Sequence, residues 1–341
     1  MKKSRQILSF IASILITAIL IFFVVKNLEW ESIRETFSQL IWKWLLIALL
    51  TYIFTYILRT FRFQALIYKQ DLSFLKLMGV TFLHGMLNYV MPARTGEFSY
   101  PVLLNQVSKI TITKSTATLL VARFFDFAFI VLSLPLVLIA LWDRLPGNIA
   151  YSLLVFIILV ILLGIGLIWA LSKYDARGEN KADVYTPRCS LRLQIIKRGR
   201  ELLQGMQKIA QLNQYKTFIL LTIGIWVGIY TNFYFIVLSL GYEPSYLQMA
   251  AVSALMVPLT LLPINGLANI GAHEAGWTTA FLLFNYSREI SLSIAVSSHI
   301  ILLVFVLIIG ATGFLTLTIS PLISLFFTKN RKNNEKEDIE F

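Results

Sequence analysis

Two pairs of oppositely charged residues interrupt apolar stretches of this chain. Arg94 and Glu97 lie in the segment LNYVMPARTGEFSYPVLL, and Arg123 and Asp126 lie in ARFFDFAFIVL. Residues three apart share one face of a helix, so each pair can form a local ion pair, and all four charges can meet. A charge at membrane depth costs about 2.5 to 3.5 kcal/mol, which makes such residues candidates for binding a polar cargo. The alternative for Arg94 and Glu97 is that they merely neutralise each other.

A second interrupted segment, LPINGLANIGAHEAGW, carries Asn265, His273 and Glu274. Glu274 mirrors Glu97, because each is an acid that follows a break containing proline and glycine. A single histidine is more often a hydrogen-bonded packing residue than a proton carrier, although its titration near neutral pH permits a role in coupling. The candidate substrate-binding residues are therefore Arg94, Glu97, Arg123, Asp126, Asn265, His273 and Glu274.

The elements that must position these residues are membrane helices. The 341 residues are 57% hydrophobic and 14% charged, whereas a soluble domain has roughly 25% charged residues. Apolar runs approach or exceed the roughly 20 residues that cross a bilayer. Six of them predict full spans, at residues 7–25, 44–58, 115–142, 151–172, 218–240 and 290–327. We interpret residues 7–25 as a retained helix rather than a cleaved signal peptide.

Several other chemistries are not supported by the sequence. The single cysteine, Cys189, excludes an internal disulfide and a thiolate-rich metal site. The other two histidines, His84 and His299, are interpreted as packing residues, and no two histidines have metal-ligand spacing. A Ser/His/Asp set and a nucleotide-binding loop are not visible either. We therefore expect a protein that is not an enzyme and uses no cofactor or metal.

The net charge of +12 is distributed as in a membrane protein rather than as in a nucleic-acid-binding protein. Basic residues at the start of the chain, after residue 58, at 173–216 and after 327 place these segments in the cytoplasm. Both termini are then cytoplasmic, in the cell inner (plasma) membrane.

Two interrupted segments complete this topology as re-entrant hairpins. Basic residues flank residues 76–107 at both ends, so a hairpin that enters from the cytoplasm and turns at Pro92 and Gly96 satisfies the charge rule. Residues 248–285 break at Pro263, Gly266 and Gly271 and enter from the outside.

The order of span, broken hairpin and span occurs twice, with an offset of about 170 residues and opposite orientation. We therefore predict an all-α integral membrane protein with six full transmembrane helices, two oppositely oriented re-entrant hairpins and an inverted repeat. The membrane domain comprises residues 1–328, with repeats at about 41–142 and 217–327. A basic cytoplasmic loop at 173–216 is expected to carry an amphipathic helix or a solvated linker, and residues 329–341 a disordered tail.

The segments PARTGEFSYPVLL, ARFFDFAFIVL and LPINGLANIGAHEAGW resemble the membrane region of the bacterial lysylphosphatidylglycerol synthase/flippase-like family. The resemblance extends from about residue 38 to residue 325. Its motif positions fall on Arg94, Gly96, Glu97, Arg123, Asp126, Gly271 and Glu274. The resemblance implies an eight-segment membrane domain that moves a phospholipid between leaflets. The synthases also have a soluble aminoacyl-transferase domain after this region, which we do not expect here.

The function we expect is a phospholipid flippase or scramblase, whose partner is a membrane phospholipid with an anionic or aminoacylated headgroup. Arginines would contact the phosphate, and Glu97 and Glu274 would hold the arginines or a cationic headgroup. Two alternatives remain open: a transporter of a small solute or polyprenyl-linked glycan, and a non-transporting partner of a membrane lipid-modifying enzyme. A second copy of the chain or a membrane enzyme are the candidate protein partners, and nucleic acid is not.

Overall fold

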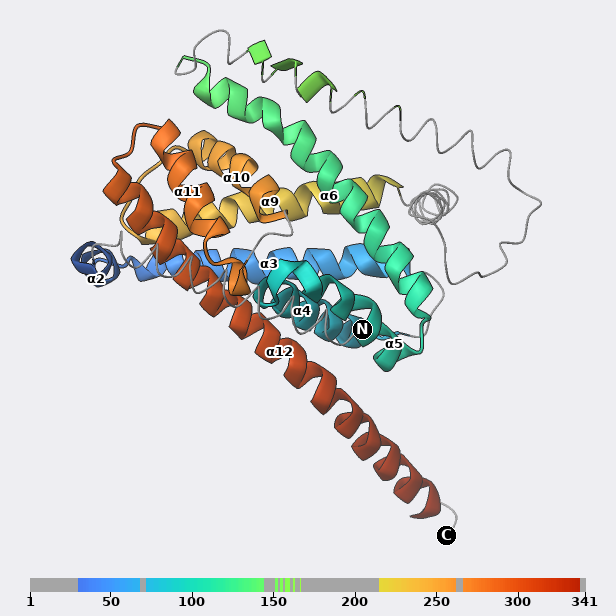
Figure 1. Ribbon diagram of the computed structural model, residues 1–341. Coiled ribbons are helices and arrows are strands. Elements are labelled where there is room, and N and C mark those ends of the chain that lie inside the picture. The colour runs from blue at the N-terminus through green and yellow to red at the C-terminus, as the bar shows by residue number, and fades with distance from the viewer. Residues whose placement is uncertain are drawn as a thin grey trace, which may run out of the picture.

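The computed structural model describes residues 30–67, 72–143, parts of 151–166, 215–261 and 266–337. The described residues form helices and contain no strand (Figure 1). The helices are α2 (Trp30–Ser38), α3 (Trp42–Leu66), α4 (Phe74–Val90), η1 (Pro92–Phe98), α5 (Ser99–Ser108), α6 (Ile112–Leu141), α9 (Tyr215–Ser239), α10 (Tyr246–Leu261), η2 (Leu267–Asn269), α11 (Ala272–Leu283) and α12 (Arg288–Glu337). The predicted all-helical architecture is therefore confirmed for this part of the chain.

Four of the described helices are long and apolar enough to cross a membrane, at Trp42–Leu66, Ile112–Leu141, Lys216–Ser239 and Arg288–Ile319. They correspond to four of the six spans expected from the sequence. The span at 7–25 lies outside the described residues, as does most of the span at 151–172.

The end of the span expected at 44–58 is wrong. The helix α3 continues through Arg59 and Arg62 to Leu66, and Arg62 is buried in the interior rather than placed in a cytoplasmic loop.

The helices α3 and α9 form an antiparallel pair through the centre of the molecule (Figure 1). At one end, the Ile41 N–H donates to the Ser239 carbonyl at 2.8 Å. Further along, the Asn232 side-chain amide donates to the Ala48 carbonyl at 2.7 Å. Glycine at position 228 leaves room for Thr55 of the partner helix, which lets the two backbones approach closely.

The remaining helices pack around this pair in two equivalent sets. The helix α4 packs against α12, and α10 packs against α6. In the same way α5 contacts α4 and α6, whereas α11 contacts α10 and α12. The two 3-10 segments, η1 and η2, contact each other. Exchange of the first set (α3, α4, α5, α6) for the second (α9, α10, α11, α12) therefore reproduces the main contacts among these helices.

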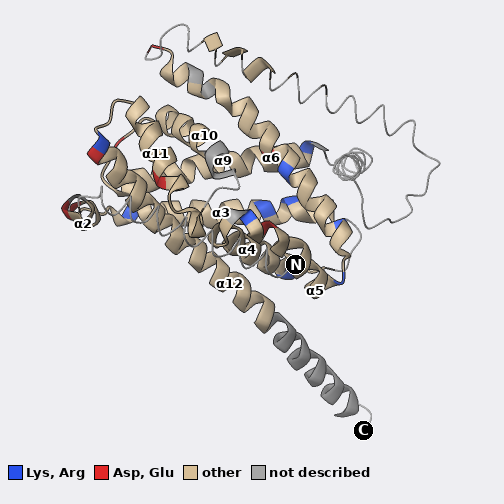
Figure 2. Cartoon of the chain, viewed as in Figure 1, with Lys and Arg blue, Asp and Glu red and all other residues tan. Residues whose placement is uncertain are grey.

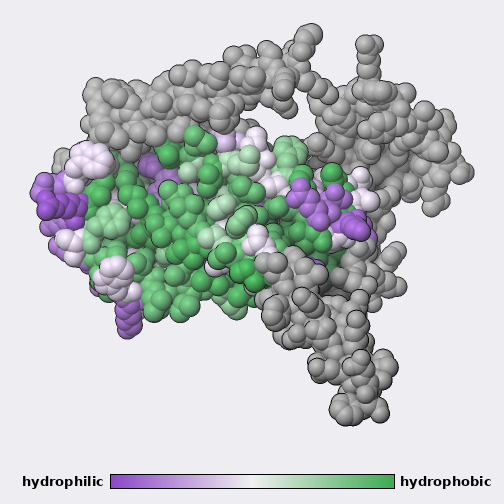
Figure 3. Space-filling view, turned by 90° about the horizontal axis from the view of Figure 1, so that it is seen from below, coloured by the Kyte–Doolittle hydropathy of each residue, from purple (hydrophilic) through white to green (hydrophobic). Residues whose placement is uncertain are grey.

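The outside of the molecule is apolar and the inside carries polar groups, as expected for a protein surrounded by lipid. Large hydrophobic side chains are exposed along α3, α6, α9 and α12, for example Leu50, Leu132, Leu220 and Leu307. Figure 3 shows this surface as a broad hydrophobic face with hydrophilic residues toward its two ends. Charged residues are sparse along the long helices, and one group of them lies where α3, α4 and α6 approach one another (Figure 2).

Two peripheral predictions have different outcomes. Helical backbone continues in α12 to Glu337, which includes part of the tail expected to be disordered at 329–341. The segment is rich in lysine and glutamate and has neither glycine nor proline, so its composition is compatible with a helix. The amphipathic helix expected within residues 173–216 falls outside the described residues, apart from the start of α9.

Candidate functional site

The first interrupted segment forms a helix, a 3-10 turn and a second helix, as expected from its proline and glycine. Pro92 occupies the start of η1, where a missing N–H is tolerated. Arg94 adopts a left-handed backbone conformation, with φ of 56°. Gly96 lies so close to the preceding helix that a Cβ atom would collide with the Leu87 carbonyl and with the Asn88 backbone. The turn thus requires glycine at position 96.

Four of the candidate residues meet in one chain of ion pairs. Arg94 Nη1 lies 3.6 Å from Glu97 Oε1. Arg123 approaches the same carboxylate with two nitrogens, at 2.7 Å from Nη2 to Oε1 and 3.2 Å from Nε to Oε2. The remaining nitrogen, Arg123 Nη1, lies 3.2 Å from Asp126 Oδ2. The local pairs predicted from the spacing of three residues are both present, and Arg123 joins them.

Asp126 is the most heavily bonded acid in this chain of ion pairs. Arg62 binds it with two nitrogens, at 2.6 Å from Nη1 to Oδ1 and 3.1 Å from Nη2 to Oδ2. The Trp226 indole N–H donates to Oδ1 at 3.1 Å. Since Arg62 is only 2% exposed, its charge depends on Asp126 for compensation. Asp126 therefore connects α3, α6 and α9.

Arg59 and Arg62 are not among the candidates predicted from the sequence, because they follow an apolar run, as loop residues do. The signal that could have found them is the helical spacing of Thr55, Arg59 and Arg62, which places polar side chains on one face of α3. Arg59 lies over the Tyr56 ring, at 4.9 Å from the ring centroid. Three arginines of the ion-pair chain against two carboxylates leave one positive charge, and Arg59 adds a second.

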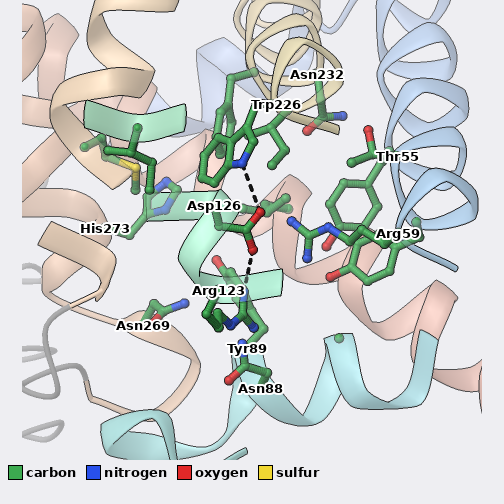
Figure 4. Close-up of a pocket in the computed structure, with 18 of the residues that line it drawn as sticks. Thr55, Arg59, Asn88, Tyr89, Arg123, Asp126, Trp226, Asn232, Asn269 and His273 are labelled. Carbon is green, nitrogen blue, oxygen red and sulfur yellow. Dashed lines mark hydrogen bonds and ion pairs between the residues drawn. The ribbon is translucent and has the colours of Figure 1, made fainter. Parts of the chain in front are cut away.

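A cavity of about 170 Å³ lies beside this chain of ion pairs (Figure 4). Arg59, Arg94 and Arg123 line it, and Asp126 is the acid on its wall. Neutral polar groups complete the lining, among them Thr55, Asn88, Asn232 and Asn269, together with aromatic rings such as Tyr56, Tyr89 and Trp226. Because Arg94 belongs to η1 and Asn269 to η2, both breaks in the helices contribute to one cavity.

Two residues on the cavity wall contain a buried polar atom without a hydrogen-bond partner among the described residues. The two atoms are Arg59 Nε and Asn88 Oδ1. One is a donor and the other an acceptor. Buried polar atoms are normally satisfied, so these two would gain a hydrogen bond from a ligand or water that reached them.

The second interrupted segment also breaks its helix but makes different contacts. Ala268 and Asn269 adopt left-handed conformations, and Gly271 has φ of 88°. Glu274 Oε2 accepts a hydrogen bond from the Gly271 N–H at 2.7 Å, which caps α11. Its other oxygen, Oε1, lies 2.5 Å from His299 Nδ1 on α12. Glu274 follows the break as Glu97 does, but its basic partner on α12 is a histidine, whereas Glu97 binds arginines.

The pairs Glu97–Arg123 and Glu274–His299 occupy equivalent places in the two sets of helices. Arg123 follows Glu97 by 26 residues, and His299 follows Glu274 by 25 residues. Each pair joins a break to the long helix that comes after it. His299 was interpreted as a packing residue, and this alignment of the two halves is the signal that could have corrected the interpretation.

The other histidines differ in their surroundings. His273 lines the cavity and stacks between Trp277 and His299, with ring centroids 5.2 Å and 4.4 Å away. His84 lies outside this group and contacts Ser99 Oγ at 2.9 Å through Nδ1. Two further residues expected at the second break, Pro263 and Asn265, lie outside the described residues, whereas Gly266 immediately precedes η2.

The family model described as the lysylphosphatidylglycerol synthase TM region matches residues 10–310. The chain belongs to this family. The match includes both interrupted segments and both ion pairs just described, and it confirms the family that the sequence motifs resemble. Among curated proteins, no match to the chain is found. Membership identifies the chain as a membrane protein of a family related to lipid metabolism.

Proposed function

We propose that this protein is a phospholipid flippase or scramblase that moves a lipid headgroup between leaflets through the cavity beside Asp126. The observation that carries the proposal is a cavity with three arginines and one carboxylate on its wall, inside a molecule whose exterior is apolar. The headgroup of a phospholipid needs polar partners, whereas the acyl chains of the lipid are stable in hydrocarbon. A cavity of this kind lets the headgroup cross while the chains stay in lipid.

The chemistry of the cavity favours a phosphate-containing headgroup. Arg59 and Arg94 present guanidinium groups, which bind phosphate oxygens through paired hydrogen bonds. Arg123 adds positive charge to the wall, while its nitrogens contact Glu97 and Asp126. Asp126 offsets only part of this charge, because Arg62 and Arg123 already occupy both of its oxygens. The unpaired Asn88 Oδ1 adds an acceptor for a hydroxyl or ammonium group of the headgroup.

We further propose that the two broken segments are re-entrant hairpins of an inverted repeat. The matching contacts of the two helix sets and the equivalent Glu97–Arg123 and Glu274–His299 pairs support this arrangement. In known transporters, repeats of this kind place broken helices around a site near the bilayer midplane, and the two halves open alternately. The contact between η1 and η2 fits such a central site.

The proposal also covers the cellular location of the protein and the role of its cavity residues. It is a multi-pass protein of the cell inner (plasma) membrane, its termini are cytoplasmic, and the residues of the cavity bind and position a lipid rather than catalyse a reaction. A second copy of the chain or a membrane enzyme would act as an additional partner.

The experiment is leaflet exchange in liposomes that contain the purified protein. A labelled anionic phospholipid should exchange between leaflets faster than in protein-free liposomes. Arg59→Gln removes a guanidinium from the cavity without breaking the chain of ion pairs, so exchange should slow by about tenfold or more. Arg34→Gln on α2, whose side chain is exposed, is the matched control and should exchange at the wild-type rate.

The outcome separates this function from the alternatives. Exchange equal to that of empty liposomes would overturn the proposal. Uptake of a water-soluble organic phosphate by the same liposomes would then support a solute transporter. Neither activity, with co-purification of a membrane enzyme, would support a scaffolding role.

A further inference from the structure

His299 has an oxygen atom opposite each of its ring nitrogens. Nε2 lies 2.8 Å from the Ala268 carbonyl oxygen, and Nδ1 lies 2.5 Å from Glu274 Oε1. A carbonyl oxygen can only accept a hydrogen bond, so Nε2 must carry a hydrogen. A neutral imidazole then has a bare lone pair on Nδ1, directed at the carboxylate. The contact is a hydrogen bond only if a further proton lies on Nδ1 or on Glu274.

We propose that Glu274 and His299 form a proton-binding site, which holds one exchangeable proton in this conformation and thereby fixes α11 against α12. The proton is shared between the imidazolium–carboxylate form and the neutral imidazole–carboxylic acid form. Both forms place one hydrogen between the same two atoms, so they bind α11 to α12 in the same way. The inference goes beyond the proposed lipid movement and does not depend on it.

Comparison with the first break shows why this pair can lose its proton. The equivalent pair joins Glu97 to Arg123, and a guanidinium stays protonated at every physiological pH. An imidazole, by contrast, can be either neutral or protonated. The two halves therefore contain a permanent ion pair at one break and a proton-dependent pair at the other.

Loss of the proton would act on the break itself. Glu274 Oε2 holds the Gly271 N–H at 2.7 Å, at a residue whose φ of 88° is left-handed. Without the proton, the His299 lone pair would face Glu274 Oε1 and push the carboxylate away. The same movement would disturb the cap of α11 and the position of η2, because Ala268 is held by the other nitrogen of His299.

His273 contacts both the cavity and the pair. This residue lines the cavity, and its ring stacks on His299 with centroids 4.4 Å apart. Its Nε2 lies 3.4 Å from Ser298 Oγ.

Other titratable or charged groups face this region from the surrounding elements. Tyr89 on α4 has its ring 6.0 Å from that of His299, and His273 belongs to α11. Arg94 on η1 and Asp126 on α6 lie on the cavity wall. Arginines bind Asp126. The helix α3 contributes Tyr52 and Arg59 to the same cavity. The helices α9 and α10 present Phe233 and Met256, which do not titrate, and α2 contacts α12 through Thr36 and Ser293. The second carboxylate of this region is thus already compensated, which leaves Glu274 and His299 to share the proton.

The test follows the protonation state directly in the full-length protein. Wild-type protein in nanodiscs of zwitterionic lipid, labelled with ¹⁵N-histidine and ¹³C-glutamate, is examined by NMR from about pH 5 to about pH 9. The chain has three histidines, so single substitutions assign their signals. The expected result is a single titration, seen as a change in the chemical shift of His299 Nδ1 or of the Glu274 carboxyl carbon as the pH is raised. The thermal unfolding midpoint should fall over the same pH range, because the bond between α11 and α12 is lost.

Glu274→Gln provides the decisive comparison. An amide can accept from the Gly271 N–H through its oxygen and donate to His299 Nδ1 through its nitrogen, so it imitates the protonated acid. At low pH this variant should have an unfolding midpoint near that of wild type. Its midpoint should not decrease as the pH is raised. His84→Gln replaces a histidine outside the site and should keep the decrease.

The possible outcomes each decide the matter. If wild-type protein shows no titration at either atom, or if the pH-dependent decrease persists in Glu274→Gln, the proposal is overturned. A titration that depends on Glu274 and His299 supports it, even when liposomes show no lipid exchange. Lipid exchange without such a titration would leave the proposed function intact and remove the proton site.

Discussion

Arg62 Nη1 lies 2.6 Å from Asp126 Oδ1, and the two residues are 64 positions apart in the chain. This buried pair attaches α3 to α6, and through the Trp226 indole also to α9. It stands at the end of the chain of ion pairs that lines the cavity. Its energetic role is to compensate a charge that would otherwise be buried alone.

Removal of one partner should therefore destabilise the protein strongly. Asp126→Asn leaves the Arg62 charge without its carboxylate, and we expect a loss of about 3–5 kcal/mol in the free energy of unfolding. Chemical unfolding in detergent measures this loss. The double variant Arg62→Met with Asp126→Leu removes both charges and should lose less than Asp126→Asn alone. Asp143→Asn, at an exposed position after α6, is the control and should remain close to wild type.

Local parts of this site could be predicted from the sequence, because they depend on short spacings. Pro92 and Gly96 indicate the first break, and a separation of three residues indicates the pairs Arg94–Glu97 and Arg123–Asp126. A 3-10 or α-helical turn brings such residues together whatever the rest of the chain does. These contacts therefore need no knowledge of the tertiary fold.

Contacts between distant elements could not be predicted in this way. Arg59 and Arg62 have the sequence pattern of loop charges, since basic residues after an apolar run usually mark the cytoplasmic side. The rule does not apply here because Asp126, on another helix, offsets the cost of burying Arg62. His299 was missed for a related reason: its role depends on Glu274, and the rest of α11, a short turn and the first part of α12 separate the two residues.

Gly96 is a second position at which a substitution should destabilise the protein. In Gly96→Ala the added methyl group would collide with the Leu87 carbonyl and the Asn88 backbone, so η1 and its Arg94 must shift. We expect a loss of about 1–3 kcal/mol in the free energy of unfolding and slower lipid exchange. Gly224→Ala on α9 is the matched control, since its methyl group would meet only the end of the Leu58 side chain at 3.1 Å. A Gly96→Ala protein as stable and active as the control would contradict the role assigned to this turn.

The geometry of Arg123 leads to a prediction about charge and shape. Its three side-chain nitrogens contact Glu97 and Asp126 together, which a lysine with a single ammonium group cannot do. Arg123→Lys keeps the charge but loses the paired contact, so we expect lipid exchange to slow by about tenfold. The exchange rate in liposomes is the measurement, and Arg34→Lys on α2 serves as control. An unchanged rate in Arg123→Lys would show that charge alone matters at this position.

The unpaired Asn88 Oδ1 allows the charge preference of the cavity to be changed with almost no change in shape. Asn88→Asp adds a negative charge beside Arg59 and Arg123, which line the same cavity. The excess of positive charge then falls, so an anionic headgroup should bind less well, whereas a cationic aminoacylated headgroup should lose less or gain. Exchange rates of the two lipids, measured in the same liposomes, give a ratio that should shift by about tenfold toward the cationic lipid. Asn285→Asp introduces the same charge at an exposed position after α11 and should leave the ratio unchanged. If Asn88→Asp slows both lipids equally, the cavity selects its cargo by shape rather than by charge.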